Sequence, residues 1–192
     1  YRQQIDTLRN QNKAYDDAKT FADDIKAAKQ ALKDAEDTIL RNIESMINSQ
    51  MTRYNDFVYN QTRKAPEINL FDGTRYEFTT PDDTGTGTSY KSLIVFDLSI
   101  LKLTQLPTLI HDSLIFNDIG YAPLEKIMEL YTQSSKQIFI AFDKKEAPTK
   151  AIQKILDSAS ILHLSSDGNE LFGENWGRKK KDEEEDSAAP TK

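Results

Sequence analysis

The sequence predicts an α/β fold in which a long N-terminal coiled-coil helix leads into a β-hairpin and then into a mostly parallel sheet with crossover helices. Three observations predict it. The first sixty residues contain neither glycine nor proline, and their apolar residues recur at spacings of three and four. Residues 67–78 alternate on both sides of an Asp-Gly pair. Beyond residue 106, short apolar runs alternate with amphipathic helical segments, as in parallel sheets joined by helices.

Composition limits what the chain does. Its 192 residues suit one domain with an appendage, and 25 Lys+Arg against 31 Asp+Glu give a net charge of -6, which argues against a uniformly basic surface for nucleic acid. The absence of cysteine excludes disulfides, thiolate zinc sites and a cysteine nucleophile, and suits the cytoplasm. No apolar run reaches the roughly 18 residues of a membrane span. Because the sequence begins at Tyr1 inside a helical pattern, we expect a fragment of a longer protein.

Residues 1–62 form the predicted coiled-coil arm. A helix of this length spans about 90 Å, far more than the core of a small domain, so its apolar stripe needs a partner strand from outside the chain. Lys29, Glu36 and Gln50 interrupt the stripe. The alternative is a bundle of two or three shorter helices, which the lack of glycine and proline disfavours. The apolar positions are Ala18, Ala22, Ile25, Leu32, Ile39, Ile43, Met46, Tyr54 and Phe57 or Val58.

A predicted α/β domain, residues 63–177, follows the arm. Pro66 ends the helical pattern, since proline disfavours helix in the residue before it. The hairpin then turns at Asp72-Gly73, the preferred two-residue connection.

The apolar run 92–101 is compatible with a strand or a helix. Its apolar residues at helical spacing favour a buried helix capped by Ser89. The preceding Gly85–Ser89 segment has two interpretations, a phosphate-binding loop at a helix N-terminus or an ordinary connector. The chain has no GxxxxGK[ST] motif, so it does not form a complete P-loop site by itself.

The rest of the domain alternates strands and helices. Phe172 and Trp176 are expected to pin the last strand to the sheet, and the charged tail 178–192 is expected to be disordered. The predicted strands are 106–113, 138–142 and 161–164, and the predicted helices are 124–131 and 149–158.

Two aspartates end neighbouring predicted strands. The carboxyl ends of parallel strands are where ligands bind, and Asp112 and Asp143 both lie there. Asp112 has two interpretations from the pattern alone, support of a hydrated Mg²⁺ or a cap on the following turn. His111 points to the opposite face from Asp112, because side chains alternate along a strand, and both His111 and His163 are interpreted as structural.

Taken in order, several segments resemble the carboxyl-terminal lobe of SMC-like and RecF-like ABC-type ATPases. More narrowly, the chain resembles the bacterial family called domain of unknown function 2326, the YydD-like proteins, from about Tyr54 to Trp176. The resemblance is carried by the long helix and by the runs YKSLIVFDLSIL, LPTLIHDSLIFNDI, KQIFIAFDK and LFGENW.

The resemblance implies a half-site. An N-terminal P-loop lobe, missing here, would complete the head, and two heads would sandwich ATP and Mg²⁺ in a homodimer that acts on DNA, in repair or defence. Asp112 falls at the Walker B aspartate, which supports the metal, and Asp143 falls near the switch histidine. Asn117 and Asp118 fall near the D-loop. The signature loop, which would bind the opposing nucleotide, corresponds to Gly85, Gly87, Ser89, Tyr90 and Lys91.

Departures from the family pattern affect hydrolysis. Ser113 stands where working ATPases have a glutamate, and a hydroxyl is a poor base at neutral pH. The alternative function is therefore a catalytically inactive coiled-coil scaffold. A hydrolase built on His111, Asp112 and Ser113 ranks last, since three consecutive strand residues do not converge on one atom.

Overall fold

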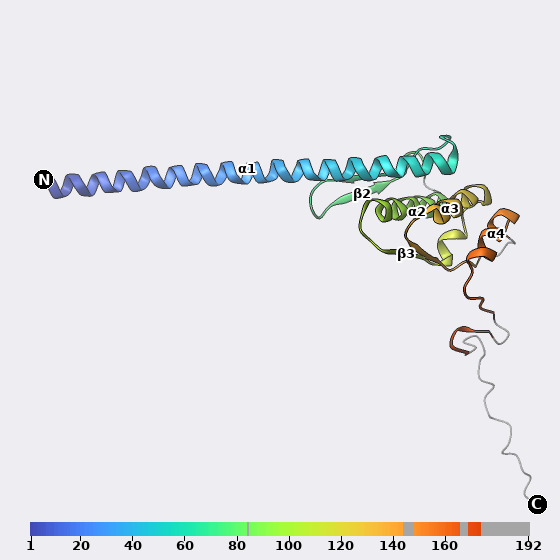
Figure 1. Cartoon of the computed structure of the whole chain (residues 1–192). Coiled ribbons are helices and arrows are strands. Elements are labelled where there is room, and N and C mark those ends of the chain that lie inside the picture. The colour runs from blue at the N-terminus through green and yellow to red at the C-terminus, as the bar shows by residue number, and fades with distance from the viewer. Residues whose placement is uncertain (84, 144–147, 166–168, 174–192) are drawn as a thin grey trace, which may run out of the picture. The chain divides into compact units, whose positions relative to one another are not determined.

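The structure, a computed structural model, describes residues 1–83, 85–143, 148–165 and 169–173. It is a mixed α/β fold with a long N-terminal helix, an antiparallel hairpin and a parallel sheet (Figure 1). Two compact units are present, Tyr1–Ile152 and Gln153–Lys192. Among the described residues, no helix is long and apolar enough to cross a membrane.

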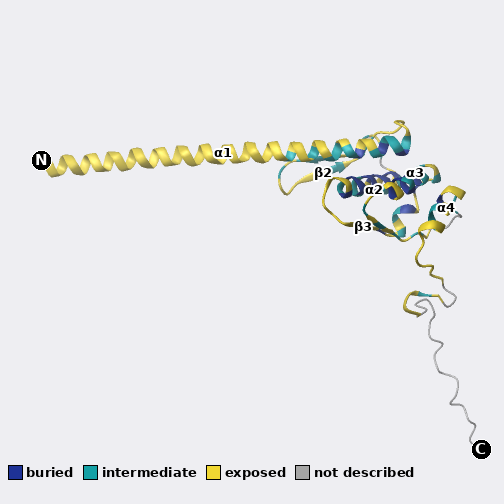
Figure 2. Cartoon of the chain, in the orientation of Figure 1, coloured by how far each residue is buried: buried dark blue, intermediate teal, exposed yellow. Residues whose placement is uncertain are grey.

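Helix α1, Arg2–Tyr59, is one uninterrupted helix, so the prediction of a single helix rather than a bundle of shorter ones is confirmed. It ends where Asn60 adopts the left-handed conformation, with φ 49° and ψ 42°, a common way to end a helix. The helix therefore ends before Pro66. Only its last turns are buried, at Met51, Asn55 and Val58 (Figure 2).

The hairpin consists of β1, Glu67–Leu70, and β2, Tyr76–Thr79, paired antiparallel. The predicted two-residue Asp-Gly turn is wrong, because five residues separate the strands. Gly73 does not take the positive φ that such a turn requires. Instead, the Asp72 carboxylate accepts hydrogen bonds from the backbone N–H groups of Thr74 and Arg75, both at 2.8 Å, which stabilises the wider loop.

Helix α2, Thr86–Leu103, confirms the helical interpretation of the apolar run but begins earlier than expected. Ser89 is not its cap. It lies within the first turns, where its hydroxyl donates to the carbonyl of Gly85 at 3.3 Å. Gly85 is the N-cap residue.

The parallel sheet consists of β3, Thr108–His111, and β4, Gln137–Ile140, in a register that pairs His111 with Ile140. A short 3-10 helix, Ser113–Phe116, and helix α3, Tyr121–Gln133, connect the two strands. The core lies between the end of α1, α2 and α3. Its fully buried members include Met51, Ile94, Val95, Leu124, Ile127 and Met128.

Helix α4, Lys150–Ala159, matches its prediction, but the last predicted strand, 161–164, is wrong. Within the described part of the chain, the parallel sheet has two strands. Ile161 and Leu162 are exposed, because an alternating pattern gives a segment the capacity for a strand but does not supply a neighbour to pair with. Phe172 is exposed as well, so it does not hold the end of the chain against the sheet as expected. Trp176 and the tail 178–192 lie outside the described residues.

Methionines on opposite sides of α1 test where the core lies. Met51 is fully buried against Ile68 and Val95, so Met51→Ala is expected to lower the free energy of unfolding by about 2–5 kcal/mol. Met46, in the same helix, is 56% exposed, and Met46→Ala is expected to change it by less than about 0.5 kcal/mol. Urea unfolding followed by near-ultraviolet circular dichroism measures both. Equal losses would contradict this assignment of the core.

Candidate functional site

The carboxyl edge of the parallel sheet carries the two predicted aspartates. Because His111 pairs with Ile140, and the N–H of Ala141 donates to the His111 carbonyl at 3.0 Å, Asp112 and Asp143 follow neighbouring strands at the same edge. Both residues are exposed. The structure thus places both residues at the same end of the sheet, as the alternation of strands and helices predicts.

Asp112 caps the 3-10 helix that follows it. Its Oδ1 atom accepts a hydrogen bond from the backbone N–H of Ser113 at 2.7 Å, and the Ser113 hydroxyl lies 3.5 Å from the same oxygen. The capping interpretation of Asp112 is therefore observed. Since the side chain is exposed rather than enclosed, the cap does not by itself remove the carboxylate from a ligand's reach.

His111 is buried and fully partnered, as its structural interpretation requires. Its Nδ1 atom lies 2.7 Å from the Tyr131 hydroxyl, and its Nε2 atom lies 3.1 Å from Oδ2 of Asp97. Burial and then the Asp97 charge raise the pKa of Tyr131 far above its usual value, which keeps that hydroxyl protonated. A neutral imidazole that donates from Nε2 to Asp97 and accepts from Tyr131 at Nδ1 satisfies all three groups. These two hydrogen bonds connect α2, through Asp97, with β3 and α3 at the residue before Asp112.

The predicted signature-like segment forms the first two turns of α2. Gly87 faces the backbone of Asp118 so closely that a Cβ on it would lie 2.3 Å from the Asp118 carbonyl oxygen. Asn117, the neighbour of Asp118, ends the 3-10 helix and donates from its N–H to the carbonyl of Leu114 at 3.4 Å. Two segments singled out from the sequence, at Gly87 and at Asp118, are therefore in contact.

Asp83 occupies the amino end of α2, and the sequence interpretation missed it. Its Oδ1 atom accepts from the backbone N–H of Gly85 at 3.2 Å, and its Oδ2 atom accepts from the Thr88 hydroxyl at 2.8 Å and from Arg63 at 3.1 Å. These bonds, the one from Thr88 first, lower the pKa of Asp83. An aspartate just before a glycine-initiated helix is the signal that would have found it.

Lys91 is buried, with 1% of its surface exposed. Its Nζ atom donates to Oδ1 of Asn55 at 3.0 Å and lies 5.3 Å from the centre of the Tyr59 ring. Burial lowers the pKa of Lys91 to about 8, an effect that the nearby Asp83 charge opposes. Lys91 is therefore directed at the end of α1 and not at the surface, while Ser89 is exposed and Tyr90 is half-buried.

The predicted residues form two separate groups. Across the described ranges, no hydrogen bond or ion pair joins Asp112 or Asp143 to the Gly85–Lys91 segment. The same ranges contain no cluster of three or more His, Asp or Glu side chains that would hold a metal ion alone.

Comparisons with known proteins identify one family. The sequence model of a family described as “Uncharacterised protein conserved in bacteria (DUF2326)” matches residues 54–176. No curated protein matches the chain.

Two solved structures show a distant likeness. One is described as “Structural biochemistry of ATP-driven dimerization and DNA stimulated activation of SMC ATPases”. It is 12% identical with a TM-score of 0.46, and the match covers 64% of this chain and 78% of that one. The other is described as “Crystal structure of the SmcHead bound to the C-winged helix domain of ScpA”. It is 14% identical with a TM-score of 0.46 over 60% of this chain and 38% of that one. Both likenesses are below the level that identifies a shared fold.

Substitution of Gly87 tests the contact with Asp118. Alanine is favoured over glycine in a helix by about 1 kcal/mol, but at Gly87 its Cβ would meet a backbone carbonyl at 2.3 Å. We therefore expect Gly87→Ala to lower the free energy of unfolding by about 1–3 kcal/mol. Gly73→Ala is the control, since a Cβ there has nothing within 4 Å. Chemical denaturation of both variants measures the difference, and a stabilised Gly87→Ala variant would exclude the close contact.

Lys91 predicts a rise of stability with pH. Its pKa is about 8 in the folded chain and near 10.5 when unfolded, so between these values the unfolded chain binds more protons. The free energy of unfolding is then expected to rise by up to about 1.4 kcal/mol per pH unit above pH 8. The measurement compares denaturation of wild type and Lys91→Met from pH 7 to about 9.5. The Lys91→Met variant should lack this rise. If the free energies of unfolding of both proteins changed in parallel with pH, the lowered pKa of Lys91 would be refuted.

Proposed function

We propose that this chain, which belongs to the family of uncharacterised proteins conserved in bacteria called DUF2326, is the carboxyl-terminal half of an SMC-like ABC-type ATPase head. In this proposal it contributes Walker B-like and signature-like elements to a composite ATP site. The arm 1–62, the lobe 63–177 and the tail 178–192 are its parts. An N-terminal P-loop lobe of the same protein completes the head, in the cytoplasm.

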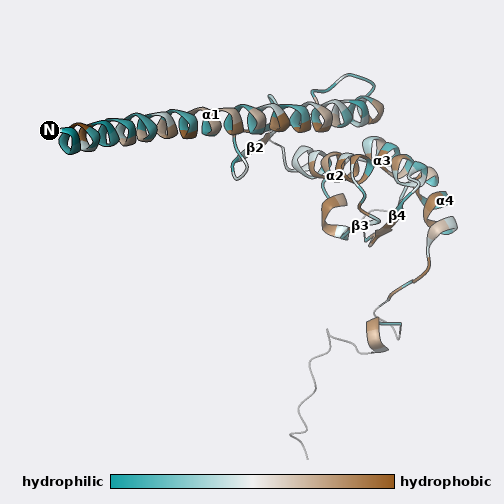
Figure 3. Ribbon diagram, turned by 60° about the vertical axis from the view of Figure 1, so that its left-hand side comes forward, coloured by the Kyte–Doolittle hydropathy of each residue, from teal (hydrophilic) through white to brown (hydrophobic). Residues whose placement is uncertain are grey.

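The incomplete parallel sheet is the observation that carries this proposal. Parallel sheets are normally covered on both faces and extend beyond two strands. Here the outer face of β3 and β4 exposes two large apolar side chains, Ile110 at 70% and Phe139 at 40%, and Leu114 of the 3-10 helix that follows β3 is 63% exposed. Figure 3 shows the hydrophobic colouring of this sheet. A second lobe that adds strands and covers this face would remove the apolar surface from water.

The residues at the sheet edge fit a metal-bound triphosphate. Mg²⁺ keeps several water ligands and needs only one or two protein carboxylates, and Asp112 is an exposed carboxylate at the end of a parallel strand. When bound, the ion neutralises charge on the phosphates. In this proposal Asp112 holds the hydrated metal and Ser113 orients water. Asp143 follows the neighbouring strand at the same end of the sheet, and Asn117 and Asp118 line the junction with α2.

The amino end of α2 fits the signature-like role. Its N–H groups favour an anion, and Asp83 already supplies one, bound to Gly85 and Thr88. A phosphate of the opposing nucleotide would take the place of this carboxylate. Gly85, Gly87, Ser89 and Tyr90 are the residues closest to that position in the sequence, whereas Lys91 acts from within the core.

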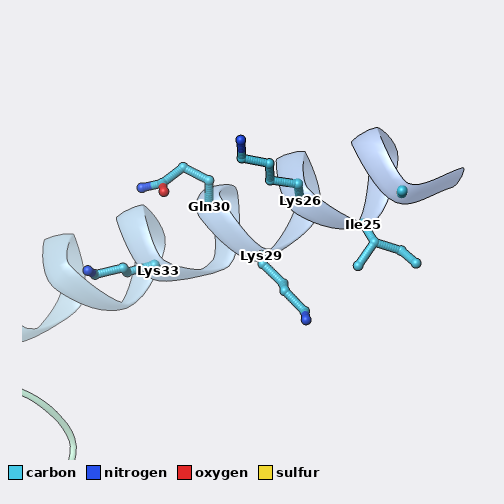
Figure 4. Close-up of a pocket in the computed structure, with 6 residues that line it drawn as sticks. Ile25, Lys26, Lys29, Gln30 and Lys33 are labelled. Carbon is cyan, nitrogen blue, oxygen red and sulfur yellow. The ribbon is translucent and has the colours of Figure 1, made fainter. Parts of the chain in front are cut away.

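The arm offers an exposed apolar stripe against which a second helix can pack. Ile25, Leu32, Ile39 and Met46 repeat every seven residues along α1, and all four are exposed. Lys29 and Glu36 occupy the intervening seam positions and interrupt the apolar stripe, and Figure 4 shows Lys29 and Lys26 pointing to opposite sides of the helix. A heptad repeat of this kind pairs with another helix. We propose that the second helix of the coiled coil packs along this stripe. Homodimer formation and DNA binding are then functions of the complete protein.

A catalytically inactive scaffold is the second candidate. Two observations favour it. Ser113 is a poor general base, and the Asp83 carboxylate already places a negative charge at the amino end of α2, where it accepts from the N–H of Gly85 and from the Thr88 hydroxyl. In that case the arm and lobe support assembly alone.

ATP turnover by the complete gene product distinguishes the two functions. If Asp112 holds the metal, Asp112→Ala is expected to lower turnover at least about tenfold, the effect of losing 1.4 kcal/mol of transition-state stabilisation. Asp37→Ala, an exposed aspartate of α1, is the control and should leave turnover unchanged. Equal rates in wild type and Asp112→Ala would remove Asp112 from the mechanism. Calorimetry with a non-hydrolysable ATP analogue completes the test, since the scaffold predicts no binding at all.

A further inference from the structure

One edge of the hairpin is covered by side chains of α1. Asn48 accepts a hydrogen bond from the N–H of Ile68 and donates to its carbonyl, both at 2.9 Å. Glu44 accepts from the N–H of Leu70 at 2.7 Å, and Arg41 donates to the Leu70 carbonyl at 2.9 Å. These three side chains hydrogen-bond the outward N–H and C=O groups of β1, as a neighbouring strand would, so no further strand can pair with this edge.

The pairing register shows what the opposite edge offers. Since the backbone groups of Ile68 and Leu70 face α1, those of Glu67 and Asn69 face β2, and their partners are Thr79 and Glu77. The backbone N–H and C=O groups of the alternate β2 residues, Tyr76 and Phe78, therefore point away from the hairpin. Over the part of the chain that the structure describes, no hydrogen bond to these four groups is found.

The two faces of the hairpin carry different side chains beside this open edge, aromatic on one face and acidic on the other. Phe78 packs on Phe96 of α2, with ring centroids 5.4 Å apart, and Tyr76 points to the same face but is 69% exposed. Leu93 of α2, one turn before Phe96, is exposed as well. The other face of β2 carries the exposed Glu77, for which no ion pair is found among the described residues.

We propose that the outer edge of β2 is a docking site for an extended peptide segment that adds a third strand to the hairpin. Three successive side chains of this segment are apolar, basic and apolar. Its basic side chain lies opposite Glu77, and its apolar side chains lie opposite Tyr76 and Phe78, above the exposed surface of α2. Main-chain hydrogen bonds hold such a strand, and the alternating side chains make it specific. This proposal does not depend on ATP binding.

In the register that uses both Tyr76 and Phe78, a second copy of the chain does not suit this edge. A two-fold antiparallel pairing through Tyr76 and Phe78 would place Glu77 directly opposite Glu77 of the other copy. Like charges directly opposite each other across a strand pair are destabilising. A basic residue in that position is favourable instead, which is why we assign the site to a different, basic segment.

The test uses an acetylated and amidated peptide of sequence Thr-Val-Lys-Val-Thr with the 192-residue chain. Amide chemical shifts of Tyr76 and Phe78 should change saturably with peptide, and hydrogen exchange of both amides should slow by about tenfold. Glu77→Lys should weaken binding about fivefold or more, and the same peptide with glutamate in place of lysine should bind this variant better than wild type.

Two controls separate strand addition from loose contact. Tyr76→Pro removes an N–H that points outward and leaves the ladder to β1 intact, so it should abolish binding, whereas Tyr76→Ala should retain it. If the proline variant does not fold, N-methylation of both peptide valines removes the matching donors, and this peptide should not bind wild type. Equal binding of the N-methylated peptide would overturn the proposal. So would the absence of saturable shifts up to about 5 mM peptide, or self-association through β2 without peptide.

Discussion

The side-chain amide of Asn55 joins the three segments on which the lobe depends. It is fully buried near the end of α1, donates to the Arg63 carbonyl at 2.8 Å and accepts from Lys91 of α2 at 3.0 Å. A buried ammonium is costly unless it is hydrogen-bonded, so Lys91 requires Asn55. Without this amide, the buried Lys91 ammonium would lose its hydrogen-bond acceptor, and the carbonyl of Arg63 would lose its side-chain donor.

This junction also connects the arm to the candidate site. Lys91 lies one turn after Gly87 on α2, and Gly87 is in contact with the backbone of Asp118. The Asn55–Lys91 hydrogen bond therefore attaches α1 to α2 one turn from the position that contacts Asp118. The hairpin is attached to α1 in the same way, through Asn48, which forms two hydrogen bonds with Ile68. Polar side chains of α1 thus position both the hairpin and α2.

Much of the fold could be predicted from local pattern. The long helix, the hairpin, α2 and the alternation around β3 and β4 follow from periodicity, and Asp112 and Asp143 lie at one sheet edge as the alternation of elements requires. The errors have local causes too. The helix begins before Ser89, where Asp83 accepts hydrogen bonds from the N–H of Gly85, the N-cap residue, and from the Thr88 hydroxyl. The two-residue turn at Gly73 does not form, since the Asp72 carboxylate stabilises a longer loop.

The sequence by itself determined which segments are helical or extended and which residue types end each strand, because these depend on neighbours a few positions apart. Only the tertiary structure decided that Lys91 points into the core, that Gly87 meets Asp118, and that residues 161–164 pair with no strand among the residues that the structure describes. Burial and strand pairing depend on groups distant in sequence, and no local periodicity specifies which distant groups will meet.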